Sequence, residues 1–104
     1  MTKTIRFHLV LAAVIALASS VGFAQSGEAT YKAKCQSCHG ATGTPSAGMA
    51  KALGIKPASD PEIKKLTVDQ MVAAVKNGKG KMKPIAGLSD AQIKDSVAFF
   101  RSFK

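Results

Sequence analysis

The sequence predicts a small all-α domain. Two segments, 67–78 and 89–103, repeat apolar residues at helical spacing behind capping residues, and no strand pattern stands out. Between the helical segments lies a stretch, 40–61, that is rich in glycine and proline and has no apolar core of its own. The only two cysteines stand beside a histidine within the five residues from Cys35 to His39. A domain this small is marginal on apolar burial alone, so we expect a group bound at these residues to complete the core.

The N-terminus has the layout of a secretory signal peptide. Basic residues precede an apolar run over 9–17, and small residues lead up to Ala24. This apolar stretch is shorter than the roughly 20 residues that cross a bilayer, so we expect cleavage after Ala24 and no permanent membrane span. The chain then divides into a signal peptide, 1–24, and one domain, 25–104, of 80 residues.

The processed domain is strongly basic. It keeps 13 of the 15 basic residues and all six acidic ones, which gives a net charge of +7. Such an excess attracts acidic partners and makes their association depend on ionic strength. Nucleic acid is disfavoured as the partner, because no recognition motif is present and the few aromatic residues fall on apolar helix faces.

The first helix of the domain is expected over 25–38. Gly27, Tyr31, Cys35 and Cys38 recur along it at i, i+4, i+8 and i+11. One stripe of the helix therefore carries a small residue, an aromatic ring and both thiols.

The Cys-x-x-Cys-His motif at Cys35, Cys38 and His39 is typical of covalent haem attachment. Two thiols at this helical spacing can form thioethers with the two vinyl groups on one edge of a porphyrin. His39 is then held against the iron, as the proximal ligand.

Three other sites are compatible with paired cysteines. Zinc needs about four ligands, and the only further histidine, His8, lies in the predicted leader. A redox dithiol is expected in a βαβ context, which the sequence lacks. A disulfide between Cys35 and Cys38 would suit an exported protein, but it would close a loop too short to stabilise much.

The remaining elements follow in order. The stretch 40–61 is expected to be mostly loop, with one short turn of helix around 49–53. The next helix opens at Thr67, whose spacing to Gln70 fits a capping box, and ends at Asn77-Gly78, a pair suited to a left-handed cap.

A second capping-box spacing, Ser89 with Gln92, opens the last helix. Its apolar face is formed by Ile93, Val97, Phe99, Phe100 and Phe103.

With these elements the chain resembles the small class I c-type cytochromes, which are soluble bacterial electron carriers. The resemblance covers nearly all of 25–104, and its specific part is the haem motif. It implies a class I cytochrome c fold, with three to four helices and loops wrapped around one covalent haem c, attached outside the cytoplasm and therefore periplasmic. In the family a glycine and an aromatic residue let the first helix cross closely over the last, and Gly27 and Tyr31 match them.

The second axial ligand is predicted to be Met82. Met71 lies on an apolar helical stripe and is expected to fill the core, and Met49 in the glycine-rich loop is a weaker candidate. Met82 stands alone among lysines between two helices, where the resembling family places its axial methionine. The family usually has proline directly after it, whereas here Lys83 intervenes before Pro84.

The resemblance also implies a hydrogen bond from the proximal histidine to a proline carbonyl in the loop after the motif. Pro45 matches by position, Pro57 is further away, and either could instead only punctuate the loop. The side chains expected to ring the exposed haem edge are lysines near the haem-binding segments, which serve either to dock an acidic partner or as ordinary solvated surface. They are Lys34, Lys79, Lys81 and Lys83.

The sequence therefore predicts a periplasmic, monomeric one-electron carrier with a His/Met-ligated haem c and no catalysis of its own. One alternative is a haem enzyme or gas-binding haem protein in which Met82 is displaceable. Another is an exported binding module without haem, in which Cys35 and Cys38 form a disulfide.

Overall fold

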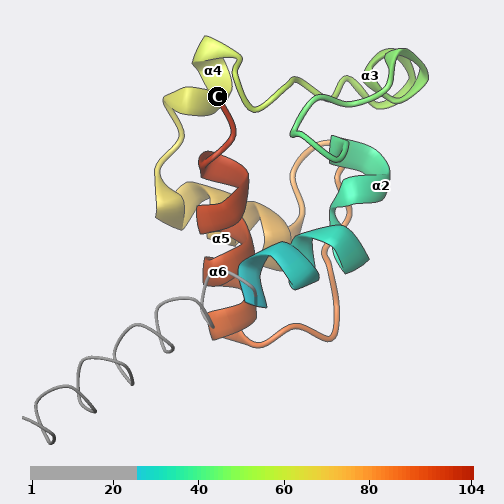
Figure 1. The fold of residues 1–104 in the computed structure, drawn as a ribbon. Helices are drawn as coiled ribbons and strands as arrows, with labels where there is room; N and C mark the ends of the chain where they lie inside the picture. The colour runs from blue at the N-terminus through green and yellow to red at the C-terminus, as the bar shows by residue number, and fades with distance from the viewer. Residues whose placement is uncertain (1–25) are drawn as a thin grey trace, which may run out of the picture.

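The computed structural model describes residues 26–104. The predicted signal peptide, its cleavage site and Gln25 lie outside the described residues. The chain forms a helix over 26–34, followed by α2 (Gln36–His39), α3 (Ala47–Leu53), α4 (Pro61–Lys64), α5 (Val68–Asn77) and α6 (Asp90–Arg101), as Figure 1 shows.

The described part of the chain is all-α, as predicted. Over residues 26–104 its β-structure is limited to one isolated bridge, between Lys79 and Met82. None of the helices in this range combines the length and the apolar character needed to span a membrane.

Capping boxes open both α5 and α6, which confirms the two predicted starts. The Gln70 amide nitrogen donates to Thr67 Oγ1 at 3.1 Å, and the Thr67 nitrogen donates to Gln70 Oε1 at 2.9 Å. Ser89 and Gln92 repeat the arrangement at 3.2 and 2.8 Å. Each pair satisfies two amide donors that a helix start leaves free.

The hydrophobic core lies between α5 and α6. Met71 and Val75 of α5 pack with Ile93 and Val97 of α6, and all four are buried. The prediction that Met71 fills the core is confirmed. Partly buried apolar side chains extend this core cluster: Ile63, Leu66, Val72, Met82, Ile85, Leu88 and Phe100.

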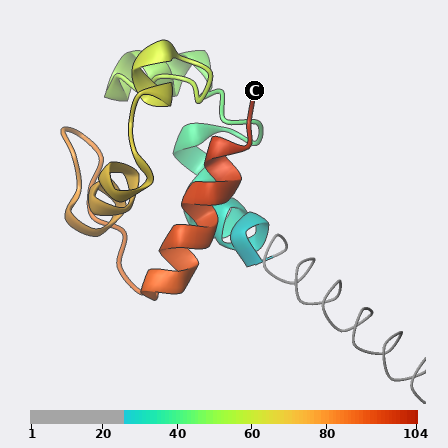
Figure 2. The same ribbon diagram turned by 90° about the vertical axis from the view of Figure 1, so that its left-hand side faces the viewer.

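The helix over 26–34 crosses α6, and the two lie side by side in both Figure 1 and Figure 2. A Cβ at Gly27 would lie 2.5 Å from the carbonyl oxygen of Asp95, so only glycine permits this approach. Tyr31 is 1% exposed and packs against three rings at centroid distances of 5.3, 6.2 and 5.4 Å, those of Phe99, Phe100 and Phe103. The predicted close crossing is confirmed.

The first helix is not continuous to residue 38, so that prediction is wrong. Cys35 adopts φ −117°, and the chain there forms a turn between the helix over 26–34 and α2. A single residue far from helical φ interrupts the ladder of hydrogen bonds, and the two segments point in different directions in Figure 1.

Three further details refine the predicted boundaries. The short helix around 49–53 is confirmed as α3, which begins earlier, after the Ser46 cap. Otherwise 40–61 was predicted to be loop, and this prediction missed the start of α4 at Pro61, behind the Asp60 cap. Gly78 ends α5 with φ 78° and ψ 164°, so the cap has positive φ but is not left-handed helical.

Candidate haem site

The residues of the haem motif share one turn of structure. Cys35 is the N-cap of the single-turn helix α2, which contains Cys38 and His39 and ends at Gly40. Both cysteines are free thiols, and all three side chains are half-buried. Two thiols and an imidazole on one short turn at the surface of the core form a compact set of donors.

Burial shifts the pKa of two of these groups, and the shift at His39 favours binding to iron. Burial raises the pKa of the Cys35 thiol, with a further contribution from the charge of Cys38. A reactive dithiol needs the opposite shift, because the thiolate is its nucleophile. Burial lowers the pKa of His39, which favours the neutral imidazole, the form that binds iron.

His39 has a polar atom that the folded protein leaves unpaired. Nδ1 is buried and has no hydrogen-bond partner. An unpaired buried nitrogen costs free energy unless a bound group, or a rotation of the ring, gives it a partner. The adjacent loop folds back beside it, since a Cβ on Gly40 would collide with the Thr44 carbonyl and lie 3.3 Å from Pro45 N. Pro45 thus lies near His39, although no hydrogen bond joins Nδ1 to its carbonyl.

Aromatic residues from α6 and the first helix contact His39 and the residue after it. The Phe100 ring lies edge-on to the imidazole, with centroids 5.4 Å apart. Tyr31 Oη donates a hydrogen bond of 2.6 Å to the Gly40 carbonyl, directly after His39. These contacts connect the motif to the crossing of the two terminal helices.

Met82 lies in a tight turn after α5. Lys79 N donates to the Met82 carbonyl at 2.9 Å, and Met82 N donates back to the Lys79 carbonyl at 3.0 Å. Ile85 N then donates to the Val75 carbonyl at 2.9 Å, which fastens the loop to α5. The Met82 side chain is half-buried and packs against the core cluster, a contact that its lysine neighbours in the sequence do not indicate. The competing Met49 is 37% exposed on α3.

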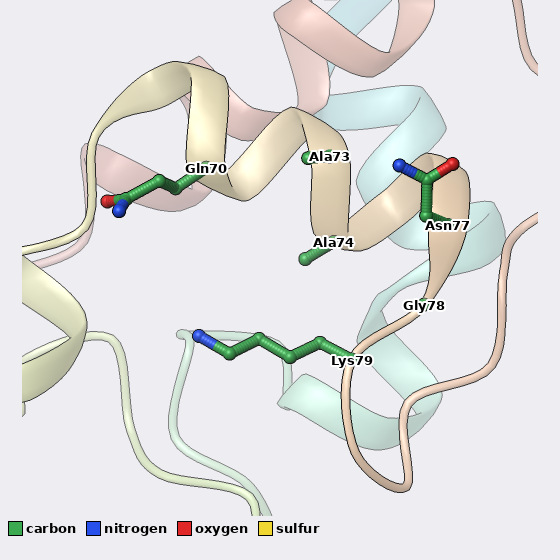
Figure 3. A pocket seen from close by; sticks show the side chains of 6 residues that line it. All are labelled: Gln70, Ala73, Ala74, Asn77, Gly78 and Lys79. Atoms are coloured by element: carbon green, nitrogen blue, oxygen red, sulfur yellow. The ribbon is translucent and has the colours of Figure 1, made fainter.

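The four lysines predicted for docking are all exposed. Lys81 Nζ donates to the Ala52 carbonyl at 3.1 Å and so links the Met82 turn to the end of α3. The Lys79 side chain extends beneath α5, opposite Ala74 (Figure 3). It borders an open cavity of about 250 Å³ that α5 lines with Gln70, Ala73, Ala74 and Asn77.

The donor set fits a c-type haem. Two free thiols are available for attachment, a half-buried imidazole has its Nδ1 unpaired, and a thioether lies in a fixed turn after α5. Within 26–104, no group of three or more histidine, cysteine or acidic side chains is arranged to hold a metal ion.

Comparison with known proteins decides the family. The family model described as cytochrome c oxidase, cbb3-type, subunit III matches residues 22–100. The chain belongs to this cytochrome c family. Two solved structures are similar to the cytochrome, whereas no curated protein matches it. The KustC0563 c-type cytochrome is 27% identical with a TM-score of 0.67, covering 75% of this chain and 96% of its own. A tyrosine-to-phenylalanine mutant of Kustc0563 is 26% identical with a TM-score of 0.66, covering 76% and 99%.

The protein is therefore a small c-type cytochrome with an all-α cytochrome c fold, and it takes part in haem-based electron transfer with redox partners. Sequence reasoning missed three residues that shape its motif. Gly40 and Gly43 have φ of 85° and 77°, and Phe100 contacts His39. The position of Gly40 directly after the motif was a visible signal for its role. The contact of Phe100 with His39 depends on how α6 is placed.

Proposed function

We propose that this cytochrome is a periplasmic one-electron carrier with a single haem c. Cys35 and Cys38 attach the haem through thioethers, His39 is the proximal ligand and Met82 the distal ligand. The observation that carries the proposal is the arrangement of both thiols on one turn with a half-buried histidine whose Nδ1 is buried and unpaired. Export by a cleaved signal peptide, 1–24, agrees with attachment outside the cytoplasm.

The bound haem supplies an iron that changes oxidation state by one electron. The chain supplies the conditions for that change. Burial keeps the imidazole of His39 neutral, and Phe100 covers one edge of its ring. A thioether is a soft, neutral ligand that favours the ferrous state and raises the potential relative to a second imidazole. Because the Met82 backbone is fixed by two hydrogen bonds to Lys79, little of the chain needs to move on electron transfer.

Pro45 is proposed to accept the hydrogen bond from His39 Nδ1, which fixes the tautomer of the ring. The support is proximity, since Gly40 brings the backbone around Thr44 and Pro45 next to the motif. Pro57 is the alternative acceptor, and Ala58, next to it, is hydrogen-bonded to the Gly43 carbonyl at 2.8 Å in the same loop.

The partner is proposed to be a redox protein with an acidic docking surface, bound by a monomer of the cytochrome. The support is the net positive charge and the exposure of four lysines in the segments beside the site: Lys34, Lys79, Lys81 and Lys83. Such docking gives fast association that weakens as salt is added. We expect the rate of electron exchange with an acidic redox protein to fall with ionic strength and, at low salt, in a variant with these lysines changed to glutamine.

The direct test is the visible spectrum of protein made in cells with cytochrome-maturation machinery. A sharp low-spin reduced spectrum, together with the weak far-red band of iron–thioether coordination in the oxidised protein, supports the proposal. We expect Met82→Ala to lose that band and to lower the reduction potential. Met49→Ala, which removes the exposed methionine of α3, is the matched control and should change neither.

Three results would redirect the proposal. An unchanged potential in Met82→Ala would exclude Met82 as the ligand. Rapid binding of carbon monoxide to the reduced wild-type protein would favour a gas-binding or catalytic haem protein with a displaceable Met82. A colourless preparation from the same cells would instead support a module without haem.

A further inference from the structure

Tyr31 makes a contact that its packing does not require. It is the only tyrosine in the chain and the only large side chain in the described residues that is less than 2% exposed. Phe99, Phe100 and Phe103 pack against its ring, and for this purpose a phenylalanine would serve equally well. The hydroxyl has a separate partner, the Gly40 carbonyl at 2.6 Å.

Gly40 is held on several sides. Its amide donates to the Gln36 carbonyl at 2.8 Å, it has φ 85°, and it faces the Thr44 carbonyl so closely that a Cβ would not fit. Burial raises the pKa of Tyr31 to about 12, so the hydroxyl stays protonated and remains a donor at any physiological pH. Tyr31 thus fixes the carbonyl of Gly40, the residue that follows His39.

We propose that Tyr31 is a positioning residue for the axial imidazole: its hydroxyl holds the Gly40 carbonyl and thereby sets the rotation of the His39 ring about its bond to the haem iron. This inference rests on the proposed role of His39 as the proximal ligand. Tyr31 is connected to His39 in two ways. One runs through the backbone, because Gly40 follows His39 directly. The other runs through Phe100, which packs against both the His39 ring and the Tyr31 ring.

The test compares oxidised wild-type holoprotein with Tyr31→Phe by proton nuclear magnetic resonance. The chemical shifts of the four haem methyl groups in a low-spin ferric haem depend on the orientation of the axial imidazole. We expect Tyr31→Phe to change the order or the spread of these resonances and to shift the reduction potential. It should also lower the folding equilibrium constant about tenfold, since a carbonyl loses its partner.

Ser96→Ala is the matched control. It removes another buried hydroxyl, which donates to the Ile93 carbonyl at 2.9 Å within α6. This variant should lose stability without moving the haem methyl resonances. Because the chain has one tyrosine, growth on 3-fluorotyrosine labels Tyr31 alone and keeps its hydroxyl, so this protein should retain the wild-type order of the resonances.

The outcomes separate the inference from the proposed function. Wild-type holoprotein without a low-spin haem would overturn the ligand assignment itself. A low-spin wild-type haem with the same methyl pattern and potential in Tyr31→Phe would leave that assignment intact and overturn the positioning role. A pattern that moves equally in Ser96→Ala would also overturn it, because the effect would then follow stability alone.

Discussion

The two halves of the domain are built in different ways. The half formed by α5, α6 and the helix over 26–34 has a core of its own, with buried residues on each of these helices. In the half that carries α2, α3 and α4, none of the three helices contains a buried residue. One half therefore folds around its own side chains, whereas the other lacks apolar surface that a haem would provide.

The largest expected effect comes from removing the attachment site. We expect Cys35→Ala/Cys38→Ala to leave the chain largely unfolded, because one half loses the surface on which it packs and the small core of the other half is marginal by itself. Far-ultraviolet circular dichroism measures the lost helix. Ser37→Ala, at the exposed residue between the two cysteines, is the control and should keep the native spectrum. Full native helix in the double variant would show that the domain folds without haem.

The second effect tests the self-supporting half. Gly27→Ala places a methyl group 2.5 Å from the Asp95 carbonyl and should lower the free energy of unfolding by about 1–3 kcal/mol, as overpacking does. Denaturant unfolding of the holoprotein measures it. Gly48 of α3 has no atom within 4 Å of its would-be Cβ, so Gly48→Ala should be neutral or stabilise by up to ~1 kcal/mol. Equal losses of unfolding free energy in Gly27→Ala and Gly48→Ala would contradict the difference between the two halves.

The third prediction removes the N-cap of a helix in each half and compares the loss of stability. Thr67→Ala and Ser89→Ala remove the caps of α5 and α6, and each should cost about 1 kcal/mol of unfolding free energy. Ser46→Ala removes the equivalent cap of α3, in which the Met49 amide donates a hydrogen bond of 3.3 Å to Ser46 Oγ. Because α3 buries no residue, loss of the Ser46 cap should fray that helix locally and leave the midpoint of global unfolding almost unchanged. Hydrogen exchange at Met49 would detect the local opening.

The smallest effect is electrostatic. The hydrogen bond and charge of Lys76 hold the pKa of Asp90 below its ordinary value of 3.8. The folded state therefore binds this proton more weakly than the unfolded state, so the contribution is complete above pH 3.8 and is lost as the pH falls through the lowered pKa. Asp90→Asn should destabilise slightly at pH 7, and the effect should disappear as the pH falls through the lowered pKa. Asp69→Asn, in the first turn of α5, lacks that partner and is the control.

Local signals predicted the elements that depend only on neighbouring residues. Both capping boxes were visible because their donors and acceptors are three residues apart, and the end of α5 at Asn77 was marked by the glycine that follows it. α4 was missed although Asp60-Pro61 is a good start signal, because that signal comes at the end of a stretch dominated by loop residues. The turn at Cys35 was missed because the spacing of the thiols is compatible with an unbroken helix.

By itself, the sequence determined the motif at Cys35, Cys38 and His39, the helical class and the start of each long helix, because these depend on residue type and short spacing. Only the tertiary structure showed that Met82 packs against the core, that Phe100 lies against His39 and that Tyr31 donates to Gly40. The Met82 and Phe100 contacts join segments remote in sequence, and the Tyr31 bond spans the turn at Cys35. Their geometry is fixed by how the helices cross and turn, which no local spacing encodes.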